Sequence, residues 1–178
     1  TEDTVTRDLL GLESTASDEE HLALIDWLNR RSDDETRTQM EDPLHSQPIV
    51  VNYTYTTDPD DNTVTADGVV FVGTNSGYLH AFKADKYNFK EYFSFMPKEL
   101  LANADLYRTS DTDQPKAYGV DGPINYWHVD INQNSQVDND EKVYLFFGLR
   151  RGGRHYYALD ISDPEAPKFQ WKISGGLG

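Results

Sequence analysis

Two patterns of hydrophobic and polar residues divide the chain near Pro43. Before this point, Leu22, Ile25 and Leu28 recur at the spacing of a helix. Ser17 stands ahead of them and is followed by three acidic residues, which suit the positive end of a helix dipole. Shortly after Pro43 the period changes to two, the period of half-buried strands. The pattern therefore predicts one N-terminal helix followed by β-structure.

Eight strands are expected beyond the helix, in two groups of four. The first group covers about 48–53, 69–74, 78–83 and 89–96. The second group covers about 121–130, 142–149, 155–160 and 168–173. Glycine-containing turns separate paired strands at Asn75-Ser76-Gly77 and Arg151-Gly152-Gly153. Polar loops are predicted at 54–67 and 105–119, and a short helix at 97–102.

The two groups of strands resemble two copies of one unit. Val70-Phe71-Val72-Gly73, before the first turn, is similar to Leu145-Phe146-Phe147-Gly148, before the second. Four short strands make one propeller blade, and propellers close with roughly 4–8 blades. The predicted fold is therefore mainly β, a partial β-propeller of two four-stranded antiparallel blades with an N-terminal helix. The alternative is an ordinary antiparallel sheet protein with chance internal similarity.

This fold predicts a division of the chain into two parts. A helical and acidic lead-in segment covers 1–42, and the partial propeller covers 43–178. Blade one is expected at about 47–104 and blade two at about 120–174. Within the lead-in segment, Arg30 and Arg31 suit the C-terminal end of the helix, and Ser32 to Gln39 is interpreted as an acidic linker.

The charge of the chain limits its partners. Lys and Arg total 16 and Asp and Glu total 31, so the net charge is −15. A nucleic-acid or anionic-lipid partner is not expected, because neutralising phosphates requires a basic face. No apolar run is long enough to insert into a membrane, and the N-terminus has no signal-peptide core. The absence of Cys excludes disulfides and thiol chemistry.

The twelve residues from Asp130 to Glu141 have the pattern of a calcium-binding loop. Oxygen-bearing side chains stand at positions 1, 3, 5, 9 and 12 of the segment. Calcium takes six to eight oxygen ligands, and alternate positions of a tight loop point toward one centre. The predicted Ca²⁺ ligands are the side chains or, for Gln136, the backbone carbonyl of Asp130, Asn132, Asn134, Gln136, Asp138 and Glu141.

This loop departs from the usual pattern at position 6, where Ser135 replaces glycine. A left-handed backbone there costs on the order of 1 kcal/mol, and two neutral Asn ligands also lower affinity. A solvated acidic hairpin loop is the alternative interpretation. A second candidate, formed by Asp58, Asp60 and Asn62 with Asp67, contains a stiff Pro59 and is interpreted as a solvated loop.

Other candidate chemistry is sparse. No phosphate-binding loop, nucleophile elbow or His-Glu zinc motif is present. His45 and Ser46 are adjacent in an extended segment, which does not give nucleophile–base geometry, and His80 and His155 are assigned structural roles. Arg150, Arg151 and Arg154 form a basic turn, interpreted as solvated, with binding of an anion or a partner carboxylate as the alternative.

Several of these segments together resemble the PilY/PilC family of type IV pilus tip proteins. They are Asp42-Pro43-Leu44-His45-Ser46-Gln47-Pro48, the segment 73–82, Val120-Asp121-Gly122-Pro123 and, most specifically, Gly148 to Asp160. The resemblance runs from about Leu24 to Gly178 and corresponds to the start of the family's C-terminal β-propeller domain. The family's large N-terminal adhesive region and most of its propeller have no counterpart in this sequence.

The resemblance implies a non-enzymatic protein that is exported through the periplasm and acts at the extracellular pilus tip, associated with the outer membrane. Such proteins support pilus assembly and twitching motility, oppose retraction and mediate adhesion, with calcium as a regulator. The implied partners are pilins or minor pilins and a host or abiotic surface. Gly73 to Phe82 also resembles blades of quinoprotein dehydrogenases, but that class gathers its calcium ligands from distant blades. A calcium-bound structural domain of unrelated origin is a third possibility.

Overall fold

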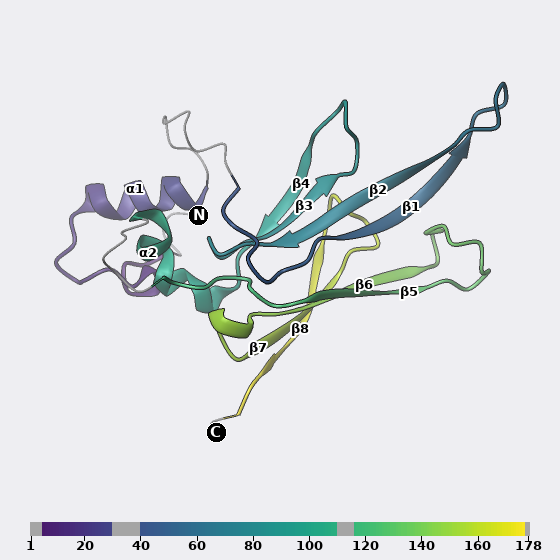
Figure 1. The fold of residues 1–178 in the computed structure, drawn as a ribbon. Helices are drawn as coiled ribbons and strands as arrows, with labels where there is room; N and C mark the ends of the chain where they lie inside the picture. The colour runs from purple at the N-terminus through teal and green to yellow at the C-terminus, as the bar shows by residue number, and fades with distance from the viewer. Residues whose placement is uncertain (1–4, 30–39, 110–115, 177–178) are drawn as a thin grey trace.

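A computed structural model describes residues 5–29, 40–109 and 116–176. Two four-stranded antiparallel sheets lie face to face, with the helices gathered at one end (Figure 1). The first sheet runs in the order β1 (Ile49–Thr57), β2 (Val64–Gly73), β3 (Leu79–Lys83), β4 (Glu91–Phe95). The second runs in the order β5 (Ile124–Val129), β6 (Lys142–Gly148), β7 (His155–Asp160), β8 (Lys168–Ser174). The prediction of a mainly β chain with two sheets of the same topology is confirmed.

The N-terminal helix begins where the sequence predicts. α1 (Asp18–Leu28) follows Ser17, whose Oγ accepts a hydrogen bond from the backbone N–H of Glu20 at 3.1 Å. The Glu20 carboxylate in turn accepts the N–H of Ser17 at 2.8 Å, which completes a capping box. A short 3-10 turn, η2 (Asp8–Leu10), precedes it. Arg30, Arg31 and the predicted linker lie outside the described residues.

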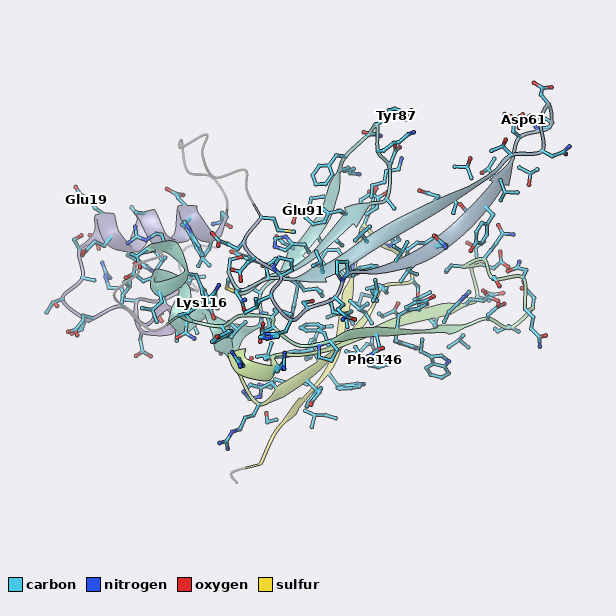
Figure 2. The ribbon with its side chains drawn as sticks, viewed as in Figure 1. Glu19, Asp61, Tyr87, Glu91, Lys116 and Phe146 are labelled. Atoms are coloured by element: carbon cyan, nitrogen blue, oxygen red, sulfur yellow. The ribbon has the colours of Figure 1, made fainter. Side chains whose placement is uncertain are left out.

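The predicted loop over 54–67 was wrong, because the two strands continue through most of it. β1 reaches Thr57 and β2 starts at Val64, with Tyr55 paired to Ala66. Thr and Tyr side chains favour extended backbone even where they are exposed, and each strand supplies the other's hydrogen bonds. Only residues 58–63 turn, closed by the Asp58 N–H donating to the Thr63 carbonyl at 2.8 Å. The result is a hairpin whose tip, at Asp61, projects beyond the sheets (Figure 2).

The connection between the sheets also differs from the sequence prediction. The expected short helix is a 3-10 helix, η4 (Lys98–Asn103), and it continues directly into α2 (Ala104–Thr109). The start of the predicted 105–119 loop is therefore helical. Leu100, Ala104 and Tyr107 are buried, and α2 packs beside α1. Packing of these apolar side chains explains why the start of a mostly polar segment forms a helix.

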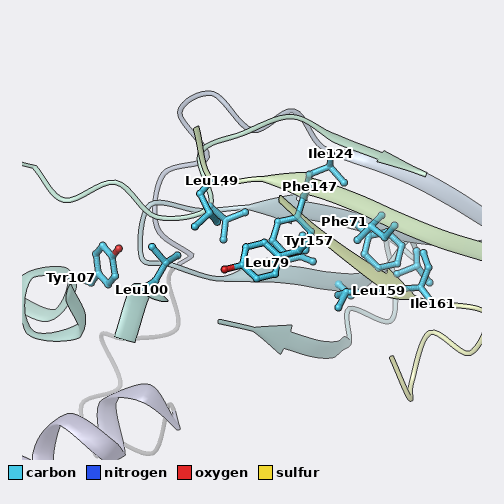
Figure 3. Close-up of a cluster of buried hydrophobic side chains, with 14 of the residues drawn as sticks. Phe71, Leu79, Leu100, Tyr107, Ile124, Phe147, Leu149, Tyr157, Leu159 and Ile161 are labelled. Carbon is cyan, nitrogen blue, oxygen red and sulfur yellow. The ribbon is translucent and has the colours of Figure 1, made fainter. Parts of the chain in front are cut away.

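A single hydrophobic core lies between the two sheets (Figure 3). Phe71 and Leu79 enter it from the first sheet, and Phe147 and Tyr157 enter it from the second. Phe95 of β4 reaches across to the second sheet, with its ring centroid 6.1 Å from that of Phe147 and 6.3 Å from that of Tyr157, edge to face. Each fully buried side chain of this size contributes roughly 1.5–3 kcal/mol of transfer free energy. Neither sheet could bury its apolar face without the other.

At the helical end, polar contacts tie residues 42–46 to the first sheet. The Ser46 hydroxyl accepts the Gly73 N–H at 2.9 Å, and the Asp42 carbonyl accepts the Asn75 N–H at 3.1 Å. The Asn75 amide also donates to the Asp42 carboxylate at 3.1 Å. Ser46 therefore serves as a structural hydrogen-bond partner of Gly73, in agreement with the rejection of a Ser-His pair.

The second sheet joins at the same place. The Val120 N–H donates to the Thr74 carbonyl at 3.0 Å, and the Gly119 N–H donates to the Asn75 side chain at 3.2 Å. His45 Nδ1 lies 2.9 Å from both carboxylate oxygens of the buried Asp121. We call this set the sheet junction: Asp42, His45, Ser46, 73–77 and 119–122. It brings together three of the segments that carry the family resemblance.

The two histidines assigned to strands have structural surroundings. His80 is completely buried in β3, and its Nδ1 lies 2.7 Å from a carboxylate oxygen of Glu91. Its Nε2 lies 3.3 Å from the Thr74 hydroxyl, so it supports the turn at the sheet junction. His155 is half-buried at the start of β7, with its ring edge to face against Tyr157.

Glu99 in η4 connects the helical segment to the second sheet. Its carboxylate accepts hydrogen bonds from the Tyr157 hydroxyl and the Lys172 ammonium. Burial alone would raise the pKa of Glu99, but the hydrogen bonds from Lys172 and Tyr157 outweigh burial and lower its pKa to about 2. The ionised form of Glu99 is therefore the form that the folded chain favours.

Replacing Glu99 should change how stability depends on pH. A depressed pKa contributes stability that is present above the unfolded value of 4.5 and is lost as pH falls through the folded value of about 2. For Glu99→Gln we therefore expect a smaller loss of unfolding free energy between pH 4.5 and 2 than for the wild type. Urea unfolding followed by tryptophan fluorescence at a series of pH values measures this loss.

A matched control for this prediction is Glu165→Gln, which removes an exposed ion pair with Lys90. This variant should keep the wild-type pH slope, since exposed pairs contribute little. If Glu99→Gln and the wild type lose stability in parallel, the interaction of Glu99 with Tyr157 and Lys172 is not the cause of the acid sensitivity.

Candidate metal centre

The twelve-residue loop lies at the opposite end of the second sheet from the sheet junction (Figure 1). β5 ends at Val129 and β6 begins at Lys142, so strands flank the loop as the sequence predicts. The β5–β6 ladder pairs these two residues directly. The first and twelfth positions of the loop are thus held close together at the mouth of a hairpin.

Four of the side chains predicted as ligands form hydrogen bonds within the loop. Asp130 accepts the backbone N–H of Asn134 at 3.2 Å and that of Ser135 at 2.9 Å. One oxygen of Asp138 accepts the side-chain amides of Asn132 at 2.6 Å and Asn134 at 2.9 Å. Positions 1, 3, 5 and 9 of the loop are therefore linked by hydrogen bonds at its surface.

Glu141, at the twelfth position of the loop, is only 3% exposed. Its carboxylate accepts the backbone N–H of Ile131 at 2.8 Å and that of Asp138 at 3.2 Å, and lies 3.0 Å from His128 Nε2. Burial alone would raise the pKa of Glu141, but these backbone and side-chain hydrogen bonds lower it below its ordinary value. The carboxylate is therefore held ionised, which is the form that binds a cation.

Tight turning of the loop requires left-handed backbone at two residues. Gln133 and Ser135 both have φ of 60°. Asn132 and Asn134 each accept the backbone N–H two residues ahead, at 3.0 and 2.7 Å, which stabilises these turns. The strain expected at Ser135 from the missing glycine is thus present in the structure.

The donor set fits calcium better than it fits a metal that prefers nitrogen or sulfur. Carboxylates and amide oxygens are hard ligands of the kind that calcium takes. Within the described parts of the chain, no three His, Cys, Asp or Glu side chains are grouped as a metal site. Asp130, Asp138 and Glu141 are thus not gathered as a cluster of three carboxylates, and the predicted site combines them with the oxygens of Asn132, Asn134 and Gln136. That ligand set stays a prediction from the sequence.

The loop also reaches across to the first sheet, at a β-bulge. The β1–β2 register shifts between Asn52 and Thr54, so Tyr53 has no partner on β2. The carbonyl of Tyr53 accepts the N–H of Val137 at 2.8 Å, and the Tyr55 N–H donates to the Gln136 side chain at 3.3 Å. The buried Tyr53 hydroxyl donates to the carbonyl of Ile161, directly after β7 of the second sheet, at 2.7 Å. We call these three hydrogen bonds the sheet clasp.

Comparison with known proteins identifies the family. Residues 38–176 match the family model described as the PilY1 beta-propeller domain. The chain belongs to the PilY1 family. The match confirms the resemblance seen in the sequence, and it makes the two four-stranded sheets the blades of a partial propeller. It covers both the sheet junction and the candidate metal loop of this PilY1-family chain.

Two curated relatives illustrate the similarity. A type IV pilus biogenesis factor PilY1 homolog of Xylella fastidiosa is 36% identical over 114 residues, which are 62% of this chain and 9% of the relative. The type IV pilus biogenesis factor PilY1 of Pseudomonas aeruginosa PAO1 is 29% identical over 131 residues, 72% of this chain and 10% of the relative. The chain thus spans about a tenth of the length of these relatives. No solved structure matches the chain significantly.

Sequence reasoning missed the residues that support the loop from outside it. His128 lies two positions before Asp130 and 3.0 Å from Glu141, and this nearness to the loop in the sequence is the signal that could have indicated it. Tyr53 and Tyr55 are more than 70 residues away in sequence, and no local pattern points to them. They contact the loop because the two blades of this PilY1-family chain pack against each other.

The second calcium candidate does not gather its residues. Asp58 and Asp60 lie at the exposed hairpin tip, where Asp58 Oδ1 accepts the Asp60 N–H at 2.8 Å. Asn62 has a left-handed backbone in the same turn. Asp67 lies back along β2, paired with Thr54. The contacts are those of a tight turn, in keeping with the solvated interpretation.

Ser135→Gly should stabilise the loop. Glycine adopts positive φ without the steric cost that a Cβ imposes, and part of the gain is offset by its greater freedom in the unfolded chain. We expect an increase in unfolding free energy of about 0.5–1 kcal/mol, measured by urea denaturation without added metal. Ser135→Ala keeps the Cβ and should give no such increase. Equal effects of the two substitutions would mean that the backbone at this position carries no strain.

Proposed function

We propose that this chain is a calcium-binding propeller segment of a type IV pilus biogenesis factor. The observation that carries the proposal is the folded loop 130–141, with its hydrogen-bonded carboxylates and amides, in a chain of the PilY1 family. The names of the Xylella and Pseudomonas relatives support the role in pilus biogenesis. Both names describe a biogenesis factor rather than an enzyme, which supports a non-catalytic function.

The finer parts of this proposal concern the whole protein. Acting from an extracellular position at the pilus tip, it would support assembly, oppose retraction and attach to a host or abiotic surface. Its direct partners would be pilins or minor pilins. No helix within 5–29, 40–109 and 116–176 has the length and apolar composition needed to cross a bilayer. The family match favours this function over that of a quinoprotein dehydrogenase.

Four acidic residues make the loop dependent on a cation. Asp130, Asp138, Asp140 and Glu141 lie within twelve residues, and near a protein surface such neighbours repel each other by roughly a few kcal/mol in total at low salt. Bound calcium would neutralise this charge. The chain's own contribution is to fold the loop through its internal hydrogen bonds and to keep Glu141 ionised by hydrogen bonding.

Through the sheet clasp, calcium binding at the loop would also affect the first blade. Gln136 and Val137 stand between the proposed ligands Asn134 and Asp138, so fixing those ligands also fixes the two residues that contact β1. Tyr53 and Tyr55 lie at the base of the projecting β1–β2 hairpin. Calcium binding should therefore steady this hairpin relative to the second blade.

Calorimetry and hydrogen exchange on the 178-residue chain test both steps. We expect one calcium site with a Kd on the order of micromolar to millimolar, because two ligands are neutral amides and position 6 lacks glycine. Asp130→Ala should abolish the binding heat. Calcium should also slow amide exchange in 53–57 and 64–67 of the wild type but not of Asp130→Ala.

Asn139→Ala is the matched control, because it alters an exposed side chain of the same loop that is not among the proposed ligands. It should bind calcium and protect the hairpin like the wild type. No binding by the wild type would refute the calcium site itself. Binding without protection of the hairpin would leave the site in place and refute its coupling to the first blade.

The role in pili is tested in cells that carry the loop variants in the complete protein. Asp130→Ala and Asp138→Ala should leave the fold intact but reduce pilus number, twitching motility or surface attachment at equal protein levels. Asn139→Ala again serves as the control. Normal pili and motility despite proven loss of calcium binding would make the loop a structural staple only.

A further inference from the structure

The arginines that the structure describes fall into two groups by their partners. Arg7 and Arg108 each form an ion pair with an aspartate, Asp18 or Asp105. Most described lysines are paired in the same way: Lys83, Lys90, Lys116, Lys142 and Lys172. The exposed arginines of one short turn, Arg150, Arg151 and Arg154, have no carboxylate partner among the described residues. In a chain with net charge −15, the gathering of unpaired guanidinium groups at one place requires an explanation.

The turn that carries these arginines is held firmly against the sheet junction. It comprises η5 (Arg150–Gly152) between β6 and β7. A Cβ on Gly152 would lie 1.8 Å from the Gly119 carbonyl oxygen, so only glycine permits this approach. Arg150 is held in left-handed backbone with φ of 51°. A firmly packed turn presents its side chains at little cost in conformational entropy when a partner binds.

Two of the three guanidinium groups are also oriented. The Arg151 guanidinium carbon lies 5.1 Å from the centre of the Tyr118 ring, and its Nη1 donates to the Tyr118 hydroxyl at 2.9 Å. Arg154 Nη1 donates to the Gly176 carbonyl at 3.3 Å. Each guanidinium group has five N–H donors in a planar fork, so most remain available. That fork matches the two oxygens of a carboxylate.

We propose that this basic turn, Arg150 to Arg154, binds a short acidic segment of a partner protein. The net charge decides against larger anions: nucleic acid or an anionic membrane would extend beyond the turn over a surface of net negative charge. A short acidic segment can contact the turn alone, since charges farther than about 10 Å are largely screened at 0.1 M salt. The turn lies at the end of the second sheet away from the metal loop, so the proposal is independent of calcium (Figure 1).

A labelled peptide of six glutamates is the probe, followed by fluorescence anisotropy at about 0.1 M salt with the complete 178-residue chain. The wild type should bind it and should not bind a peptide of six glutamines. Arg150→Gln with Arg154→Gln should weaken binding at least about tenfold, because charge-assisted hydrogen bonds to carboxylate are lost. Arg151→Lys should also weaken binding, because lysine cannot form the planar fork over Tyr118.

The matched control is Lys86→Gln with Lys168→Gln, which changes the net charge equally at exposed lysines that form no ion pair within the described residues. It should keep the wild-type affinity. Equal weakening by the two double variants would overturn the proposal, because the effect would then be one of net charge. Tighter binding of a short DNA duplex than of the glutamate peptide would overturn the assignment to an acidic protein segment. Thermal denaturation of each variant establishes that it is folded.

Discussion

At the sheet junction, backbone packs against backbone without room for a side chain between, and the packing of the two sheets follows from this contact. A Cβ on Gly119 would lie 2.4 Å from the Gly77 nitrogen, and one on Gly73 would lie 2.4 Å from the Val120 carbonyl oxygen. These two contacts limit the distance between the first sheet and the segment that leads into the second. At that distance Phe95 can contact both Phe147 and Tyr157, and one core forms between the sheets.

Burying polar groups at this junction has a cost that residues 42–46 offset. Asp121 and Asn75 are buried, and an unpaired buried carboxylate or amide would destabilise the fold. His45 and Asp42 supply the missing partners from a segment that belongs to neither sheet. The segments that resemble the PilY/PilC family are thus largely those that build this junction, which explains why they identify a fold more directly than an activity.

The two ends of the second sheet have different physical characters. At the junction, β6 and β7 are joined by a tight glycine turn whose shape follows from packing. At the other end, β5 and β6 are joined by a loop whose interior consists of carboxylates and amides. The shape of the first depends on steric fit, whereas that of the second depends on charged and polar side chains. This difference is the reason for proposing a cation site at the loop and a separate binding surface at the turn.

The local features of this protein can be predicted from neighbouring residues alone. The capping Ser17, the eight strands and the spacing of oxygens from Asp130 to Glu141 are patterns of neighbouring residues, which short-range physics decides. Tertiary structure decided what depends on distant contacts. The extended hairpin past Thr57 formed because each strand supplied the other's hydrogen bonds, and α2 formed because its apolar face was covered. The attachment of the loop to Tyr53 requires two sheets packed face to face, which no local pattern encodes.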